Sequence, residues 1–156
     1  MLIDKKKSSL LIIDVQEKLC SVMSKPHTFI DNIIKLQKAA NILKVPITYS
    51  EQYPEGLGKI IDQIKKNLNS KDKLIEKVDF SLELNTNIKT ESQIIITGIE
   101  AHVCVLQTAI KLSEKKGNLI YIVQDGVSSR YQKDYLLALI SLVKYPNIYL
   151  VSCEMV

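Results

Sequence analysis

Apolar residues along the chain fall into two alternating kinds of segment. One kind is a short, nearly continuous apolar run, which is typical of a strand buried on both faces of a parallel sheet. The pattern predicts six strands, at Ser8–Val15, Val45–Ser50, Lys73–Val78, Gln93–Gly98, Asn118–Gln124 and Asn147–Ser152. The other kind repeats its apolar residues every three or four positions, which is typical of a helix with one buried face.

The helical segments lie between the predicted strands. They are predicted at Thr28–Lys44, Lys59–Leu68, Leu82–Lys89 and Gln132–Lys144, with a further helix that carries Cys104 in its first turn and ends near Gly117. Two stretches follow neither pattern. Glu51–Gly58 (EQYPEGLG) is predicted as a loop, and Asp125–Arg130 (DGVSSR) as a turn that ends the fifth strand and leads into the last helix.

This alternation of strands and helices predicts an α/β fold with a doubly wound, mostly parallel six-stranded sheet. The expected strand order is 3-2-1-4-5-6, with helices on both faces, as in a Rossmann-like three-layer sandwich. In that order strand 1 lies beside strand 4, and ligands bind beyond the carboxyl ends of the strands at this switch point. We expect residues 1–156 to form one domain, because the chain has no repeat, linker or low-complexity segment.

Composition narrows the possible functions. The net charge of +4 comes from lysines spread over amphipathic segments, with a single arginine, Arg130, so we expect no nucleic-acid partner. No run approaches the roughly 18 apolar residues of a membrane span, and the N-terminal apolar run is too short for a signal peptide. Three cysteines, an odd number without paired spacing, favour a reducing compartment, so we expect a cytoplasmic protein.

Cys104 is the first candidate for chemistry. The strand before it turns at Gly98, so the thiol is expected at the start of a helix, where the helix dipole favours thiolate. The alternative is a small buried side chain without a chemical role, which is the more common fate of a lone cysteine. Cys20 and Cys153 lie among apolar residues and are interpreted as such core thiols.

Asp14 and Lys77 are the candidate partners of this thiol. Asp14 ends strand 1, which the switch point places beside Cys104, and its carboxylate could remove and return a proton. Lys77 ends strand 3 and could stabilise developing negative charge, although a strand-end carboxylate or a solvated lysine is the simpler reading of either residue alone. His27 and His102 share no metal-ligand spacing, and His102 is expected to face away from Cys104 along the helix.

Three motifs together resemble the isochorismatase-like cysteine hydrolases over nearly the whole chain. They are LLIIDVQEKL around Asp14, EKVDFS around Lys77 and TGIEAHVCVLQTA around Cys104. EQYPEGLG and VSCEMV look most like the subgroup of isochorismatase domain-containing proteins. The resemblance implies the same doubly wound fold and an Asp14–Lys77–Cys104 triad. It also implies a cis peptide between Ile99 and Glu100, which would direct the backbone N–H groups of Glu100 and Cys104 at an oxyanion.

The chain departs from some members of that family. Nicotinamidases of the superfamily bind a metal through histidines after strand 2, where this chain reads SEQYPEGLG, so we expect neither a metal nor a nicotinamide substrate. Isochorismate hydrolases proper lack the cysteine, and its presence here implies covalent chemistry. Relatives continue with a helix beyond the segment that ends here at Val156, and they usually form dimers or tetramers, which we expect of this chain too.

These features predict a hydrolase that needs no cofactor and cleaves a C–N bond of a small amide through Cys104. By loop position and family analogy, the substrate pocket is expected to be lined by Gln16, Leu19, Gln52, Tyr53, Phe80 and Val103. Two alternatives remain open. One is a non-catalytic binding or scaffold protein with the same fold, and the other, suggested only by the basic charge, is a protein that acts on nucleic acid.

Overall fold

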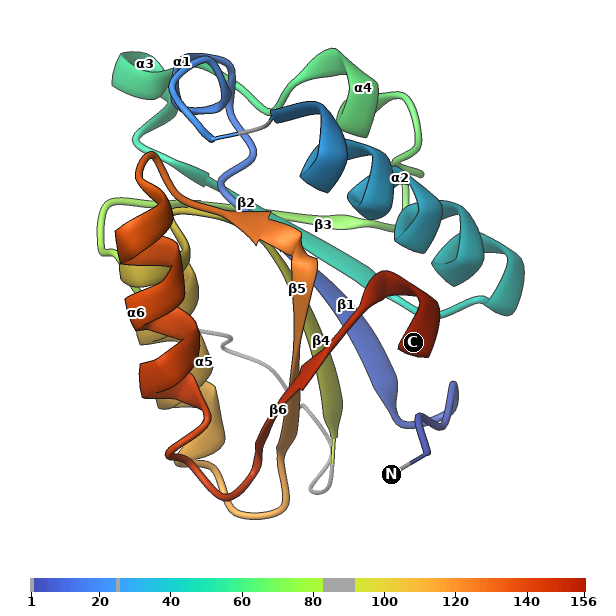
Figure 1. The fold of residues 1–156 in the computed structure, drawn as a ribbon. Coiled ribbons are helices and arrows are strands. Elements are labelled where there is room, and N and C mark those ends of the chain that lie inside the picture. Colours follow the sequence, from blue (N-terminus) through green and yellow to red (C-terminus); the bar gives the residue numbers. More distant parts are fainter. Residues whose placement is uncertain (1, 25, 83–91) are drawn as a thin grey trace.

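A parallel sheet of six strands forms the centre of the computed structural model, which describes residues 2–24, 26–82 and 92–156 (Figure 1). The strands are β1 (Ser8–Ile13), β2 (Ile47–Gln52), β3 (Lys73–Lys77), β4 (Gln93–Ile99), β5 (Leu119–Ser128) and β6 (Ile148–Val151). Their order is β3-β2-β1-β4-β5-β6, and every pairing is parallel. The predicted fold and strand order are therefore confirmed.

Helices cover both faces of the sheet. They are α1 (Glu17–Cys20), α2 (Pro26–Leu43), α3 (Pro54–Leu57), α4 (Asp62–Lys65), the π-helix η1 (Ala101–Val105), α5 (Leu106–Ser113), α6 (Gln132–Leu142) and the 3-10 helix η2 (Cys153–Met155). In Figure 1, α2 lies on one face, and α5 and α6 lie together on the other. The helix predicted at Lys59–Leu68 is reduced to α4, whereas the one predicted at Leu82–Lys89 falls on residues 83–91, outside the described part of the chain.

Successive side chains of β1 point into two separate cores. Leu10 and Ile12 are buried in a core shared with α2, and Leu11 and Ile13 in a core shared with α5 and α6. All four are at most 2% exposed. Full burial of such a side chain stabilises a fold by roughly 1.5–3 kcal/mol. Burial on both faces therefore fixes the position of β1 and of the residue that follows it.

The predicted turn at Asp125–Arg130 is wrong. Strand β5 continues through Asp125 and ends at Ser128, because a register shift between Ile96 and Gly98 lets its last residues pair with the end of β4. The backbone oxygen of Asp125 accepts a hydrogen bond of 2.9 Å from the Asn32 side chain of α2, which supports this extension. Arg130 and the start of α6 are thereby carried to the carboxyl end of β4.

Gly98 is required where β4 passes β1. Its φ of +131° is one that L side chains rarely adopt, and a Cβ built on it would lie 2.6 Å from the backbone nitrogen of Ile13 and 2.8 Å from its carbonyl carbon. Gly98 and Ile13 are paired neighbours in the centre of the sheet, so the two backbones cannot separate without disturbing the β1–β4 ladder.

We expect Gly98→Ala to lower the free energy of unfolding by about 3 kcal/mol, because it adds backbone strain to an overpacked contact. Denaturant unfolding followed by circular dichroism measures the change. Gly126→Ala in β5 is the matched control, since its new Cβ would meet only side-chain atoms, at 3.2 Å from Thr97 Cγ2 and Val123 Cγ1. Equal losses in the two variants would contradict a clash specific to Gly98.

Candidate active site

Asp14 is the first residue after β1 and is fully buried at the carboxyl edge of the sheet. Both carboxylate oxygens are engaged. Oδ1 accepts a hydrogen bond of 2.7 Å from Ser50 Oγ, and Oδ2 forms an ion pair of 2.7 Å with Lys77 Nζ. A buried carboxylate with these partners is held in one orientation and keeps its charge compensated.

Lys77 is the last residue of β3 and reaches across β2 to Asp14. Its side chain is only 6% exposed, and its ammonium group donates to Gln52 Oε1 at 2.6 Å as well as to Asp14. The backbone oxygens of Asp79 and Phe80 each lie 3.2 Å from Nζ. Gln52 is the register partner of Lys77 in the sheet, which explains why the two side chains meet.

Cys104 lies in the π-helix η1, directly beyond β4, and is 5% exposed. Its thiol interacts with both Asp14 and Lys77, so the three candidate catalytic residues meet at one place. Burial raises the pKa of Cys104 to about 12; the charge of Asp14 contributes to the increase, and Lys77 partly offsets it. The prediction that the helix start would favour thiolate is therefore wrong for the resting protein, because the penalty for burying the charged form dominates.

The raised pKa of Cys104 predicts a distinctive pH dependence of alkylation. We expect the iodoacetamide rate at Cys104 to rise about tenfold per pH unit from pH 7 to 10 without levelling off, because the thiolate fraction grows in this way below the pKa. Peptide mapping by mass spectrometry separates Cys104 from Cys153. A plateau near 9.0, the ordinary value, would contradict the shift.

The raised pKa of Cys104 also makes the stability of the fold depend on pH. Folding favours the protonated thiol, so this contribution to the free energy of unfolding is present below pH 9.0 and is lost as the pH rises towards 12. Cys20, whose pKa burial also raises to about 12, acts in the same direction.

The backbone at this edge adopts unusual conformations. Asp14, Tyr53 and Glu100 each follow a strand directly and have φ values of +52°, +39° and +46°. Left-handed backbone in residues other than glycine costs on the order of 1 kcal/mol each, and it gathers at functional sites. None of the described peptide bonds is cis, so the expectation for Ile99–Glu100 is wrong; in the structure the chain leaves β4 through the left-handed backbone of Glu100.

A cavity of about 430 Å³ opens beside the Cys104 thiol. Four of the six residues predicted to contact substrate lie on its wall, namely Leu19, Gln52, Phe80 and Val103. The other lining residues are Leu57, Glu100, His102, Cys104, Arg130, Tyr131 and Asp134. One part of the wall is therefore apolar, whereas the part formed by Glu100, His102, Arg130 and Asp134 is charged or polar.

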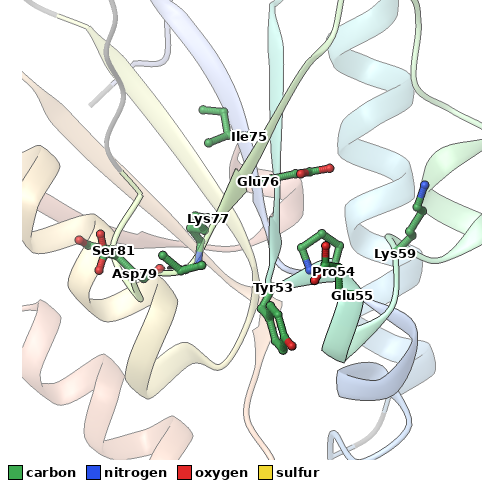
Figure 2. Close-up of a pocket in the computed structure, with 10 residues that line it drawn as sticks. Tyr53, Pro54, Glu55, Lys59, Ile75, Glu76, Lys77, Asp79 and Ser81 are labelled. Atoms are coloured by element: carbon green, nitrogen blue, oxygen red, sulfur yellow. Dashed lines mark hydrogen bonds between the residues drawn. The ribbon is translucent and has the colours of Figure 1, made fainter.

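Gln16 and Tyr53 lie elsewhere. Gln16 is fully buried, and its side-chain amide joins the end of β2 to the C-terminal end of α3: Oε1 accepts from Gln52 N at 2.7 Å, and Nε2 donates to Gln52 O at 3.0 Å and Gly58 O at 2.6 Å. Tyr53 lines a separate hollow of about 820 Å³, which Lys77 also lines (Figure 2). There Tyr53, Pro54 and Glu55 stand opposite Lys77, Asp79 and Ser81.

The structure adds residues that the sequence patterns did not identify. Ser50 supplies the second hydrogen bond to Asp14, and its place at the end of the predicted second strand was the available signal. His102 does not pair with Cys104, since its Nδ1 lies 3.0 Å from Ser129 Oγ and 3.5 Å from Glu100 Oε2. Arg130 and Asp134 reach the cavity only because β5 extends beyond its predicted end.

Among residues 2–24, 26–82 and 92–156, no group of three or more His, Cys, Asp or Glu side chains is arranged to hold a metal ion. No helix in the same ranges has the length and apolar character needed to cross a membrane.

Known proteins resemble this chain in sequence and in fold. The isochorismatase domain model matches residues 8–151. Isochorismatase family protein 1B of Dictyostelium discoideum is 38% identical over 141 residues, covering 85% of this chain and 68% of that protein. The solved MAR1 ribonuclease of Caenorhabditis elegans superposes with a TM-score of 0.91 at 34% identity, over 97% of this chain and 80% of that one.

A more distant structure shows the fold alone. The YcaC gene product of Escherichia coli, described as an octameric hydrolase of unknown specificity, has a TM-score of 0.83 at 20% identity, over 96% of this chain and 77% of that one. The resemblance inferred from the three motifs is confirmed, since a family model that spans all six strands matches the chain. This chain belongs to the isochorismatase family of hydrolases.

Proposed function

We propose that the chain is a metal-independent cysteine hydrolase that cleaves the C–N bond of a small amide through a covalent intermediate on Cys104. The observation that supports this most directly is the meeting of the Cys104 thiol with the buried Asp14–Lys77 pair beside a cavity of about 430 Å³. A nucleophile, a base and a fixed cation from three separate strand ends are the parts that acyl transfer requires.

In the first half of the reaction, Asp14 accepts the thiol proton as Cys104 Sγ attacks the carbonyl carbon of the amide. With no cis bond at Ile99–Glu100, we assign the oxyanion that forms to the backbone N–H of Glu100, at the left-handed turn after β4, and to that of Cys104 in the π-helix, each worth about 3 kcal/mol. Lys77 stays paired with the site and compensates negative charge in both states. Asp14 then gives the proton to the nitrogen, the C–N bond breaks, and the amine leaves a thioester on Cys104.

In the second half, Asp14 takes a proton from water as the oxygen attacks the thioester carbonyl. The tetrahedral intermediate collapses, the C–S bond breaks, and the proton returns from Asp14 to the sulfur. The products are a carboxylic acid and an amine, and the thiol is restored. In this scheme the pKa of about 12 keeps the resting thiol neutral, so the proton moves to Asp14 only when a carbonyl is in place.

Trapping the thioester tests the proposal. The protein is incubated with a panel of small aliphatic and aromatic amides and with the activated ester p-nitrophenyl acetate, then quenched in acid and mapped by mass spectrometry. We expect acylation at Cys104 and release of acid and amine from at least one amide. Acylation at Cys20 or Cys153 instead would contradict the mechanism.

The second candidate is a binding protein that retains the fold without catalysis. The neutral, 5% exposed Cys104 thiol is the observation that favours it, because such a thiol is a poor nucleophile at rest. Tight binding of a panel compound with no acylation and no turnover would support it. Since one similar structure is a ribonuclease, single-stranded RNA belongs in the panel. Cleavage of this RNA by both the parent protein and a Cys104→Ala variant would indicate a reaction that does not use the thiol.

We also propose that the protein forms a homo-oligomer in a reducing, cytoplasmic compartment. Four apolar side chains on the outer face of α6 and at its C-terminal end are 48–60% exposed, namely Leu136, Leu137, Ile140 and Val143, and a second copy would cover them. All three cysteines are free. Sedimentation velocity tests the assembly: a monomer at micromolar concentration would contradict it, and a Leu137→Lys variant that assembles like the parent would contradict an interface on α6.

A further inference from the structure

Glu100 has a side-chain arrangement that the triad does not explain. It is the first residue after β4, its backbone is left-handed, and its carbonyl oxygen accepts hydrogen bonds from Val103 N at 2.9 Å and Val105 N at 3.3 Å in the π-helix. The proposed role of its N–H as an oxyanion donor requires this backbone to be held.

The Glu100 carboxylate is buried, and one cation holds it. Its side chain is 9% exposed, and Oε1 accepts a hydrogen bond of 2.6 Å from Arg130 Nε, whose side chain is 52% exposed. Oε2 is buried and has no hydrogen-bond partner among the residues that the structure describes. His102 Nδ1 lies 3.5 Å from it and 3.0 Å from Ser129 Oγ. The carboxylate is therefore fixed between the end of β5 and the π-helix.

We propose that the Glu100–Arg130 ion pair is a positioning device for the oxyanion site: it holds the left-handed backbone of Glu100 so that its N–H faces the carbonyl oxygen of the substrate. The inference rests on the oxyanion role given to that N–H under the proposed function. Removing Arg130 leaves a buried carboxylate without its cation, and such a group is driven towards solvent. Because the carboxylate is joined to the left-handed residue itself, this movement turns the N–H away.

Two reagents separate positioning from general damage. Acylation by p-nitrophenyl acetate passes through a tetrahedral oxyanion, whereas alkylation by iodoacetamide displaces iodide at a saturated carbon and forms none. Both consume the Cys104 thiol in the same cavity. Because both reactions share the same thiolate fraction, the ratio of the acylation rate to the alkylation rate at Cys104 cancels that fraction and reports on oxyanion stabilisation.

We expect Arg130→Met to lower this ratio at least tenfold, since loss of one oxyanion donor lowers rates by roughly 10²–10³. Glu100→Gln keeps the shape, weakens the pair, and is expected to lower the ratio less. Arg130→Lys, which retains the charge, should restore the ratio to within about threefold of the parent. The double variant should fall no further than Arg130→Met alone, because the two residues act as a unit.

Lys144→Met, which removes an exposed cation beyond the far end of α6, is the control and should leave the ratio unchanged. An unchanged ratio in Arg130→Met would overturn the inference and leave the proposed function standing. So would equal losses in the two rates, because they would indicate general damage to the site. A parent protein that is alkylated at Cys104 but never acylated there would overturn the proposed function, and the inference with it.

Discussion

Replacing Cys104 with alanine is expected to abolish turnover of the amide that the panel identifies, with a loss of at least about 10⁴-fold. The variant has no sulfur to attack the carbonyl, and neither Asp14 nor Lys77 can form the thioester. Acyl labelling at this position should disappear in the same sample. The measurement is the initial rate of amine release, together with intact mass after acid quenching.

The matched control is Cys153→Ala, which removes a partly exposed thiol outside the cavity and should keep the parent rate. Cys104→Ala should also stay folded, because it removes only the sulfur atom of a side chain that borders the cavity. If it retained more than a few per cent of the turnover, the covalent mechanism would be wrong and direct attack by water would replace it.

Replacing Asp14 with asparagine is expected to move two measurements in opposite directions. Turnover should fall by roughly 10²–10⁴-fold, because the thiol loses the base that takes its proton and the acid that returns it. Alkylation by iodoacetamide near pH 8 should become faster. The variant loses the Asp14 charge, which raises the pKa of Cys104, and it keeps Lys77, which lowers that pKa.

These opposite directions distinguish a base from a residue that only holds the site together. A misfolded site would change the turnover rate and the alkylation rate in the same direction. Asp62→Asn, which changes an exposed carboxylate on α4, is the control and should alter neither rate. If Asp14→Asn turned the amide over at the parent rate, another group would have to be the base.

The meeting of Asp14 and Cys104 was predictable from topology alone. Apolar runs gave six strands, and the doubly wound order places strand 1 beside strand 4, so residues that follow these strands become neighbours. Lys77 was harder, because β3 lies two strands away from β1. Its long side chain spans β2, and Gln52, its register partner, guides it to Asp14.

Other features depend on interactions that a single sequence does not reveal. The pKa of Cys104 follows from burial, and the helix-dipole expectation left burial out. The polar wall of the cavity depends on the extension of β5. The sequence did not reveal this extension, because Asp125 and Gly126 form a pair that is typical of a turn. Gln16 stood at a loop position typical of substrate contact, but the backbone of Gln52 and Gly58 takes up both ends of its amide.

The left-handed residues that end β1, β2 and β4 set a limit on how this protein can be stabilised. Glycine would relax the backbone at Asp14 and Glu100, yet it would delete the proposed base and the carboxylate that Arg130 holds. Selection for activity and selection for a more stable fold therefore oppose each other at this edge. Lys44, at φ +59° just after α2, has the same backbone type away from the cavity. We therefore expect substitutions that relax the backbone to raise thermal stability at Lys44 and to lower activity at Asp14 and Glu100.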